Sequence, residues 1–276
     1  MEKRTIVLLG KTGVGKSATG NTILRRNRFE SCRSVDSVTE ECAFEEAVIN
    51  GKCVRVVDTP GFFDTEMSDE ELAIEIARSV YLSQQGVHAF LLVIPYGTFT
   101  KQEEEIISKV QEVFGEKVTE HMIILFTKAD GVENSDIENS SNEHLKRSLQ
   151  KCGDRYLMFD NTAQGSTTQV TDLLEMTERV VEHNSGKSYT NEVYKAAQRS
   201  TFDAFWETFK QLFLMAAAKF KKAYKASDCF AQGLMSDIGL SKDDKWKPSL
   251  LGVVVGLVVE TVTFVIRVTF NVFYQK

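Results

Sequence analysis

Short apolar runs alternate with longer stretches of helical periodicity through the first 184 positions of this 276-residue chain. Uninterrupted apolar runs of this length are typical of strands that are buried on both faces of a sheet. They occupy residues 5–9, 54–57, 89–94 and 122–126, with a weaker run at 155–159 and an edge strand expected at 43–49. The helical stretches occupy residues 16–24, 69–83, 101–114, 141–151 and 169–184. This alternation predicts an α/β fold, a sheet with helices on both faces.

The pattern divides the chain into three parts. The sheet domain is expected over residues 1–190, because the polar, glycine-bearing stretch at 183–186 is typical of a linker. Residues 191–248 are expected to form an amphipathic helical extension, since aromatic side chains recur at spacings of three and four between 191 and about 225. The apolar face of this helix either packs back on the sheet domain or contacts a partner or a membrane.

The third part, residues 249–276, is strongly apolar and long enough to span a membrane. Glu260, Thr263, Arg267 and Asn271 nevertheless fall on one face of a helix. Such a polar stripe does not suit a lone span surrounded by lipid. Two interpretations therefore stay open: attachment to a membrane, or a soluble helix buried against the rest of the chain or in an oligomer.

Composition narrows the class of protein. A hydrophobic fraction of 42% and a charged fraction of 26% are ordinary for a globular protein. The net charge of −6 gives no reason to expect nucleic acid as a partner. Five scattered cysteines without metal-ligand spacing indicate reduced thiols. The amino end has no signal-peptide pattern, so we expect the chain to start in the cytosol.

The strongest chemical signal is G-K-T-G-V-G-K-S at residues 10–17, which matches the phosphate-loop pattern between a strand and a helix. Backbone N–H groups of such a loop and the positive end of the following helix hold phosphates. Lys16 would reach the outer phosphates and Ser17 would ligate Mg²⁺. The predicted nucleotide contacts here are Gly10, Lys11, Thr12, Gly13, Val14, Gly15, Lys16, Ser17 and Ala18.

A second motif, D-T-P-G at residues 58–61, also follows an apolar run. Asp58, at the end of the run at 54–57, is expected to hold Mg²⁺, and Gly61 to offer a backbone N–H to the γ-phosphate on a mobile loop.

The segment T-K-A-D at residues 127–130 follows the run at 122–126. Asp130 can accept two hydrogen bonds from guanine, and Lys128 can pack its stem along the base. Thr127 replaces the more familiar asparagine of this motif. Asn161, after the fifth run, is either a base contact or a turn residue.

Together, residues 10–24, 56–65, 86–93 and 126–130 resemble the AIG-type, or GIMAP, family of immunity-associated GTPases. The resemblance covers about residues 1–190. It implies a P-loop GTPase domain, a G domain of septin- and Toc-like type with a C-terminal helical extension, which binds GTP or GDP with Mg²⁺ and forms a homodimer or homo-oligomer through its nucleotide face. Several members hold a membrane or lipid-droplet surface through a C-terminal hydrophobic segment, which residues 249–276 are similar to.

The resemblance has two further implications. The chain is expected at the cytoplasmic face of a membrane, or in the cytosol otherwise. Thr39 matches the switch threonine that completes the shell of Mg²⁺ and the γ-phosphate.

The sequence argues less for catalysis than for binding. Phe62 follows D-T-P-G where Ras-like proteins use a glutamine to position water, and Thr98 stands where many family members carry an arginine. His88 is either a catalytic contact across a dimer or a structural residue beside a buried strand. Two functions stay open: a slow, dimer-stimulated GTPase, or a GTP-dependent switch or scaffold. An ATP-driven enzyme would require Asp130 to play no part in base choice.

Overall fold

A computed structural model describes residues 2–30, 41–61, 69–97, 99–129, 134–162 and 167–211 of the chain. Two compact units are present, residues 1–202 and 203–276, and the nucleotide motifs all belong to the first.

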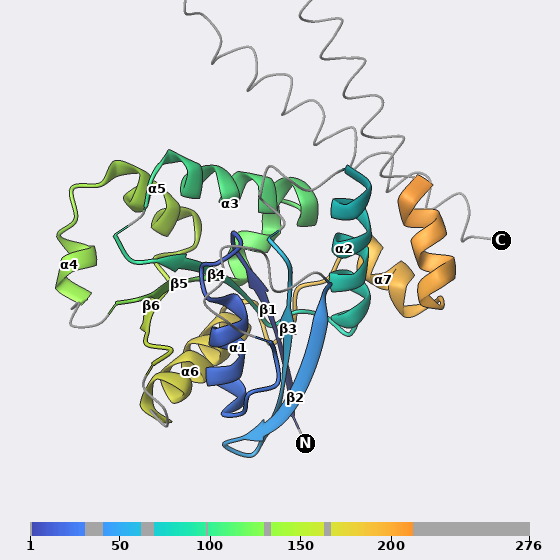
Figure 1. The fold of residues 1–276 in the computed structure, drawn as a ribbon, viewed down its shortest axis with the longest axis horizontal. Helices are drawn as coiled ribbons and strands as arrows, with labels where there is room; N and C mark the ends of the chain where they lie inside the picture. The colour runs from blue at the N-terminus through green and yellow to red at the C-terminus, as the bar shows by residue number, and fades with distance from the viewer. Residues whose placement is uncertain are drawn as a thin grey trace, which may run out of the picture. The chain divides into compact units, whose positions relative to one another are not determined.

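A six-stranded sheet forms the centre of the first unit (Figure 1). Its strands are β1 (Lys3–Leu9), β2 (Ala43–Ile49), β3 (Lys52–Asp58), β4 (Ala89–Pro95), β5 (Met122–Thr127) and β6 (Tyr156–Phe159). The strand order is β2-β3-β1-β4-β5-β6, with β2 antiparallel to β3 and every other pair parallel. β1 and β4 lie at the centre of the sheet, where side chains can pack on both of its faces. Five of the seven residues of β1 are accordingly less than 3% exposed: Thr5, Ile6, Val7, Leu8 and Leu9.

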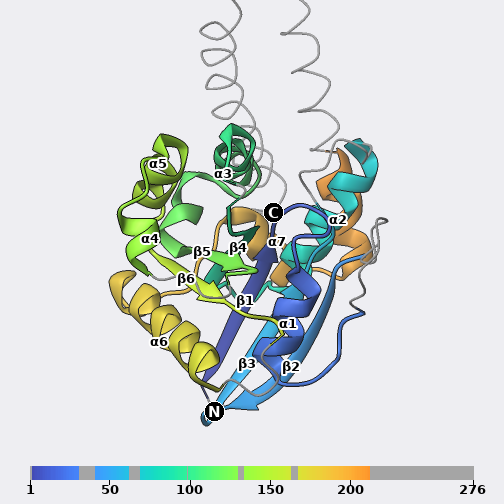
Figure 2. The same ribbon diagram turned by 60° about the vertical axis from the view of Figure 1, so that its left-hand side comes forward.

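Helices cover both faces of this sheet (Figures 1 and 2). They are α1 (Lys16–Leu24), α2 (Asp69–Leu82), α3 (Lys101–Phe114), α4 (Asn134–Glu138), α5 (Glu143–Lys151), α6 (Thr167–His183) and α7 (Glu192–Gln198), with a 3₁₀ helix η1 (Glu116–His121). α1 and α6 share one face, where Ile23 and Leu173 join a buried cluster with Ile6 and Leu8. α2, α3 and α5 lie on the other face (Figure 2).

The predicted α/β fold is confirmed, and the expected elements all form with small shifts at their ends. The helix expected from residue 141 begins at Glu143, because the side chain of Asn142 caps it by accepting hydrogen bonds from the backbone N–H groups of His144 and Leu145. α4 and η1 are short elements that hydrophobic periodicity did not predict, since five or six residues are too few to show it.

The chain turns at residues 183–186 and continues to pack on the first unit. Val87 and Tyr189 form a β-bridge, and the Tyr189 ring lies 5.3 Å from the Phe90 ring, centroid to centroid. Tyr194 of α7 is 1% exposed. The unit therefore includes α7 and extends to residue 202.

Within the described residues, the predicted helical extension from residue 191 contains a break. α7 ends at Gln198, and helix resumes at residue 202 after a break. The hydroxyl of Ser200 donates to the carbonyl of Ala196 at 2.9 Å, and such side-chain bonds compete with continued helix. In the second unit, residues 203–211 are helical, with the Phe205 and Phe209 rings 5.7 Å apart.

Most of the predicted extension at 191–248, and the whole apolar segment at 249–276, lie outside the described residues. Among the helices that are described, none combines the length and apolar character needed to cross a bilayer.

Candidate nucleotide-binding site

The carboxyl ends of the parallel strands form the edge where the predicted residues gather. The phosphate loop follows β1, Asp58 ends β3, Thr127 ends β5, and Asn161 comes two residues after β6. Because these strands run parallel, their ends meet at one edge of the sheet, which is where ligands bind in α/β folds.

The phosphate loop requires glycine at its first and last turns. Gly10 has φ 145°, and a Cβ there would lie 2.6 Å from the carbonyl oxygen of Val93 on β4. Gly15 has φ 99° and begins α1, and a Cβ there would meet Asn161 Nδ2 at 3.4 Å and Thr127 Cγ2 at 3.8 Å. The loop is therefore seated on the ends of β4 and β5, where Gly10 leaves no room for a Cβ and the positive φ of Gly15 disfavours any other residue.

Lys16 is folded into this loop. Its side chain is buried, and its ammonium donates to the carbonyl oxygens of Gly10 at 3.1 Å and Lys11 at 2.7 Å. The positive charge is thus held where the loop curves, and phosphate oxygens entering the loop would meet it.

Ser17 and Asp58 come together as a metal site would require. The Ser17 hydroxyl donates to Asp58 Oδ2 at 2.6 Å, and Asp58 is 1% exposed. A hydroxyl and a carboxylate are oxygen ligands of the kind that Mg²⁺ prefers beside phosphates, so the pair fits the ion. When bound, Mg²⁺ would neutralise phosphate charge. In the described part of the chain, no group of three His, Cys, Asp or Glu residues is placed to hold a metal ion.

Thr59 anchors the segment that carries Gly61. Its hydroxyl is fully buried and donates to the carbonyl of Leu8 at 2.6 Å. Gly61 itself is buried at the end of this anchored segment. The sequence pattern did not predict this role of Thr59, although its position directly after Asp58, the expected Mg²⁺ ligand, is a readable signal.

Thr127 links the segment that is expected to bind the base to the phosphate loop. Its hydroxyl donates to the carbonyl of Val14 at 2.9 Å, while its own carbonyl accepts from the backbone N–H of Tyr96 at 2.8 Å. A threonine at this position therefore forms the link between the two loops directly. Lys128 follows with an exposed side chain and φ 55°, a left-handed conformation that costs energy for a residue with a side chain.

Asn161 is held against α1. Its Nδ2 donates to Thr19 Oγ1 and its Oδ1 accepts from Thr22 Oγ1, both at 3.1 Å. The side chain therefore joins the loop after β6 to α1, and the alternative of a base contact by Asn161 stays a prediction.

His88 is not brought to this site. It precedes β4 and therefore lies at the opposite edge of the sheet from the phosphate loop. The ring Nδ1 of His88 accepts from the backbone N–H of Thr5 at 2.9 Å, and the backbone N–H of His88 donates to the carbonyl of Thr5 at 2.8 Å. The catalytic interpretation of His88 is thus corrected: the ring extends the pairing of β1 and β4, a structural role.

This placement gives His88 a pH-dependent effect on stability. Burial, followed by the positive charge of Arg4, lowers the pKa of His88 from 6.5 to about 4. The unfolded chain then binds a proton more readily than the folded chain, so the free energy of unfolding falls as the pH drops from 6.5 towards 4.

We expect the wild type to lose about 1–2 kcal/mol more than His88→Gln between pH 7.5 and pH 5, measured by urea unfolding. Glu178, His121 and Glu2 also act on His88, and comparing two variants cancels their own titration. Equal losses in both proteins would contradict this effect.

Two predicted site residues, Thr39 and Asp130, lie outside the described residues, as do Phe62 and Thr98. The Mg²⁺ contact expected of Thr39 and the guanine contact expected of Asp130 stay predictions.

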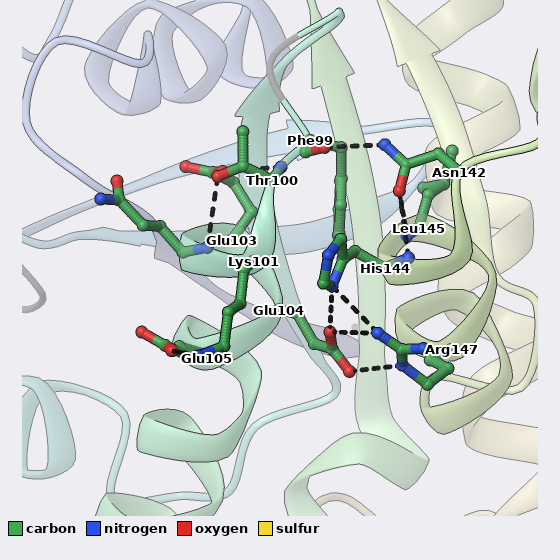
Figure 3. Close-up of polar contacts among 11 residues, drawn as sticks. Phe99, Thr100, Lys101, Glu103, Glu104, Glu105, Asn142, His144, Leu145 and Arg147 are labelled. Carbon is green, nitrogen blue, oxygen red and sulfur yellow. Dashed lines mark hydrogen bonds and ion pairs between the residues drawn. The ribbon is translucent and has the colours of Figure 1, made fainter. Parts of the chain in front are cut away.

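The structure also shows a link that the sequence analysis missed, between the phosphate loop and α3. Lys11 Nζ donates to Glu103 Oε1 at 2.7 Å. Glu103 Oε2 accepts from the backbone N–H of Thr100 at 2.9 Å and forms a capping box at the start of α3 (Figure 3). The spacing T-x-x-E at residues 100–103 was a readable signal for the cap, though not for the ion pair.

A mostly parallel sheet of this order, with a glycine-rich loop between β1 and α1 and a Ser–Asp pair beside it, defines a P-loop nucleotide-binding domain of the G-domain type. The chain belongs to the AIG1 family, whose model matches residues 4–208.

Sequence comparison with individual proteins supports the assignment to this family. Immune-associated nucleotide-binding protein 9 of Arabidopsis thaliana is 37% identical over 206 residues, which is 71% of this chain and 60% of the relative. GTPase IMAP family member 8 of Homo sapiens is 35% identical over 196 residues, covering 69% of this chain and 30% of the relative. The resemblance to GIMAP proteins is therefore confirmed. The match spans about three fifths, or less, of each of these relatives.

Solved structures share the fold at low identity. Toc33 from Arabidopsis thaliana in complex with GDP and Mg²⁺ has a TM-score of 0.53 at 16% identity, covering 68% of this chain and 87% of that one. A dimerisation-deficient mutant of Toc33 has a TM-score of 0.52 at 14% identity, with the same coverage. These likenesses support the Toc-like G-domain fold.

Proposed function

We propose that this chain binds GTP and GDP together with Mg²⁺ and assembles through its nucleotide face as a GTP-dependent switch or scaffold. The observation that carries the proposal is the preformed phosphate site: Lys16 is buried inside the loop, and the Ser17 hydroxyl lies 2.6 Å from the Asp58 carboxylate. Membership of the AIG1 family and the likeness to Toc33, solved with GDP and Mg²⁺, support guanine nucleotide as the ligand.

The proposed assembly through the nucleotide face is supported by membership of the AIG1 family and by the likeness to Toc33. A dimerisation-deficient mutant of that protein was solved, which means that Toc33 itself dimerises. In this chain, the turn at residues 96–97 lies beside the phosphate-binding edge, because the backbone N–H of Tyr96 bonds to Thr127. A partner docked on this edge would cover the nucleotide.

The test compares binding with turnover in the purified full chain. Binding of GTP, GDP and ATP is measured with and without Mg²⁺, and GTP turnover is then followed across protein concentration. Tight, Mg²⁺-dependent guanine binding with flat, negligible turnover and nucleotide-dependent assembly supports the switch or scaffold. Turnover that rises with concentration favours the alternative, a slow dimer-stimulated GTPase, and a preference for ATP overturns the assignment of guanine to Asp130.

We also propose, from the sequence alone, that residues 249–276 hold the chain at the cytoplasmic face of a membrane or on a lipid droplet. Flotation of the full chain and of a chain ending at residue 248 with phospholipid vesicles tests this. Equal flotation of the two proteins would contradict it.

A further inference from the structure

The side chain of Lys11 points from the phosphate loop to α3. Its ammonium bonds to Glu103 Oε1 at 2.7 Å and to Gln102 Oε1 at 3.2 Å. The Lys11 side chain is 29% exposed, and that of Glu103 is only 10% exposed. A second lysine of the loop is therefore held beside the site by a carboxylate that is largely shielded from water.

The main chain of Lys11 lies where the phosphates would bind. Its carbonyl oxygen accepts from the ammonium of Lys16 at 2.7 Å, and Lys16 is the residue that would meet the outer phosphates. The flexible four-carbon stem of a lysine lets its ammonium change partners without movement of the backbone. To meet the same anion, the Lys11 ammonium would have to leave Glu103 and turn back towards the loop.

Glu103 is fixed independently of Lys11. It also accepts from the backbone N–H and hydroxyl of Thr100, the cap of α3 (Figure 3). Burial alone would raise the pKa of Glu103, but hydrogen bonds from Lys11 and Thr100 outweigh burial and hold that pKa below its usual range. Glu103 is therefore a charged, stationary competitor for the Lys11 ammonium at neutral pH.

We propose that Lys11 is a second cation for the outermost phosphate of GTP, and that Glu103 holds its ammonium until that phosphate enters the loop. The inference rests on the proposed function. It makes Lys11 a residue that favours GTP over GDP, because only GTP brings the γ-phosphate. It makes Glu103 a positioning residue that sets how strongly GTP is favoured, since each GTP must displace the carboxylate from Lys11.

The competition predicts opposite effects for the two partners of one ion pair. Lys11→Met should lower the ratio of affinities for GMPPNP, a non-hydrolysable GTP analogue, over GDP by about 5–10-fold, the effect of one lost charge-assisted hydrogen bond. Glu103→Gln should raise the same ratio by about 3-fold, because glutamine can still cap Thr100 but no longer attracts the ammonium. The double variant should behave like Lys11→Met.

Glu104→Gln is the matched control. Glu104 is the next residue of α3, and it pairs with Arg147 at 2.9 Å and His144 at 2.6 Å on α5 (Figure 3). Among the described residues its polar partners belong to α5 and not to the phosphate loop, so its loss should change stability but leave the affinity ratio unchanged. Affinities are measured by fluorescence titration of the full chain with labelled GMPPNP and GDP, and thermal unfolding verifies that each variant is folded.

A stabilising ion pair with no further role would give a different result. Both single variants would then weaken the two nucleotides alike, or leave both unchanged, and either outcome overturns the inference. The inference is also overturned if Glu103→Gln raises the ratio of GMPPNP to GDP affinity even when Lys11 is replaced. The same holds if the ratio rises only at protein concentrations where the chain dimerises. Wild-type chain that binds neither nucleotide refutes the proposed function itself, whereas normal binding with an unmoved ratio refutes only the role of Lys11.

Discussion

Replacing Lys16 with alanine is expected to weaken binding of GTP and GDP by about 100-fold or more, the loss of two charge-assisted hydrogen bonds to phosphate. The ammonium already lies inside the loop, bonded to the carbonyls of Gly10 and Lys11. Without it, nucleotide charge would be drawn into a buried loop with fewer donors. Titration with labelled GDP, at fixed Mg²⁺ concentration, measures the loss.

Lys101→Ala is the control for this change. Lys101 is an exposed lysine at the start of α3 that pairs only weakly with Glu105 at 3.3 Å (Figure 3). Its removal should leave the affinity within about twofold of wild type, since exposed ion pairs contribute little. Unchanged affinity in Lys16→Ala would place the nucleotide elsewhere, and the phosphate-loop assignment would fail.

Tyr194→Ala is expected to lower the free energy of unfolding by about 3–5 kcal/mol, the usual cost of removing a large buried ring. Tyr194 lies on α7 and is 1% exposed, with its ring 5.9 Å from that of Tyr189. Tyr189 in turn packs on Phe90 of the central strand β4. Deleting the ring therefore leaves a cavity that extends towards the sheet. Equilibrium unfolding in urea measures the change.

Two comparisons make this prediction specific. Tyr194→Phe keeps the ring and should cost less than about 1 kcal/mol. Lys195→Ala, at the neighbouring exposed position, should have an effect within about 0.5 kcal/mol. A cost for Tyr194→Ala no larger than that of Lys195→Ala would show that α7 contributes nothing to the stability of the first unit.

Hydrophobic pattern predicted the central elements of the fold because each buried strand is a continuous apolar run. The helix at Lys16–Leu24 and the edge strand at Ala43–Ile49 were predicted with the bounds that the structure has. The break before residue 202 was not predicted, because the spacing of apolar residues does not record where backbone hydrogen bonding stops.

The phosphate loop could be predicted from the sequence because its residues are contiguous and their spacing is fixed by the chemistry of phosphate binding. His88 was open to a catalytic interpretation because the sequence gives a residue's neighbours along the chain, whereas the strand direction that puts it at the far edge is a property of the sheet. Contacts across 92 positions, such as Lys11 to Glu103, require the folded arrangement of β1, β4 and α3.

The hydrogen bond from Thr127 to the carbonyl of Val14 joins the segment that would read the base to the loop that would hold the phosphates. The spacing between the two ends of the site is therefore set during folding, before any ligand arrives. A nucleotide that fits this spacing does not have to order the two loops against each other, so less conformational entropy is lost on binding. The same spacing disfavours ligands in which base and phosphate are separated by a longer or shorter connection than in a nucleotide.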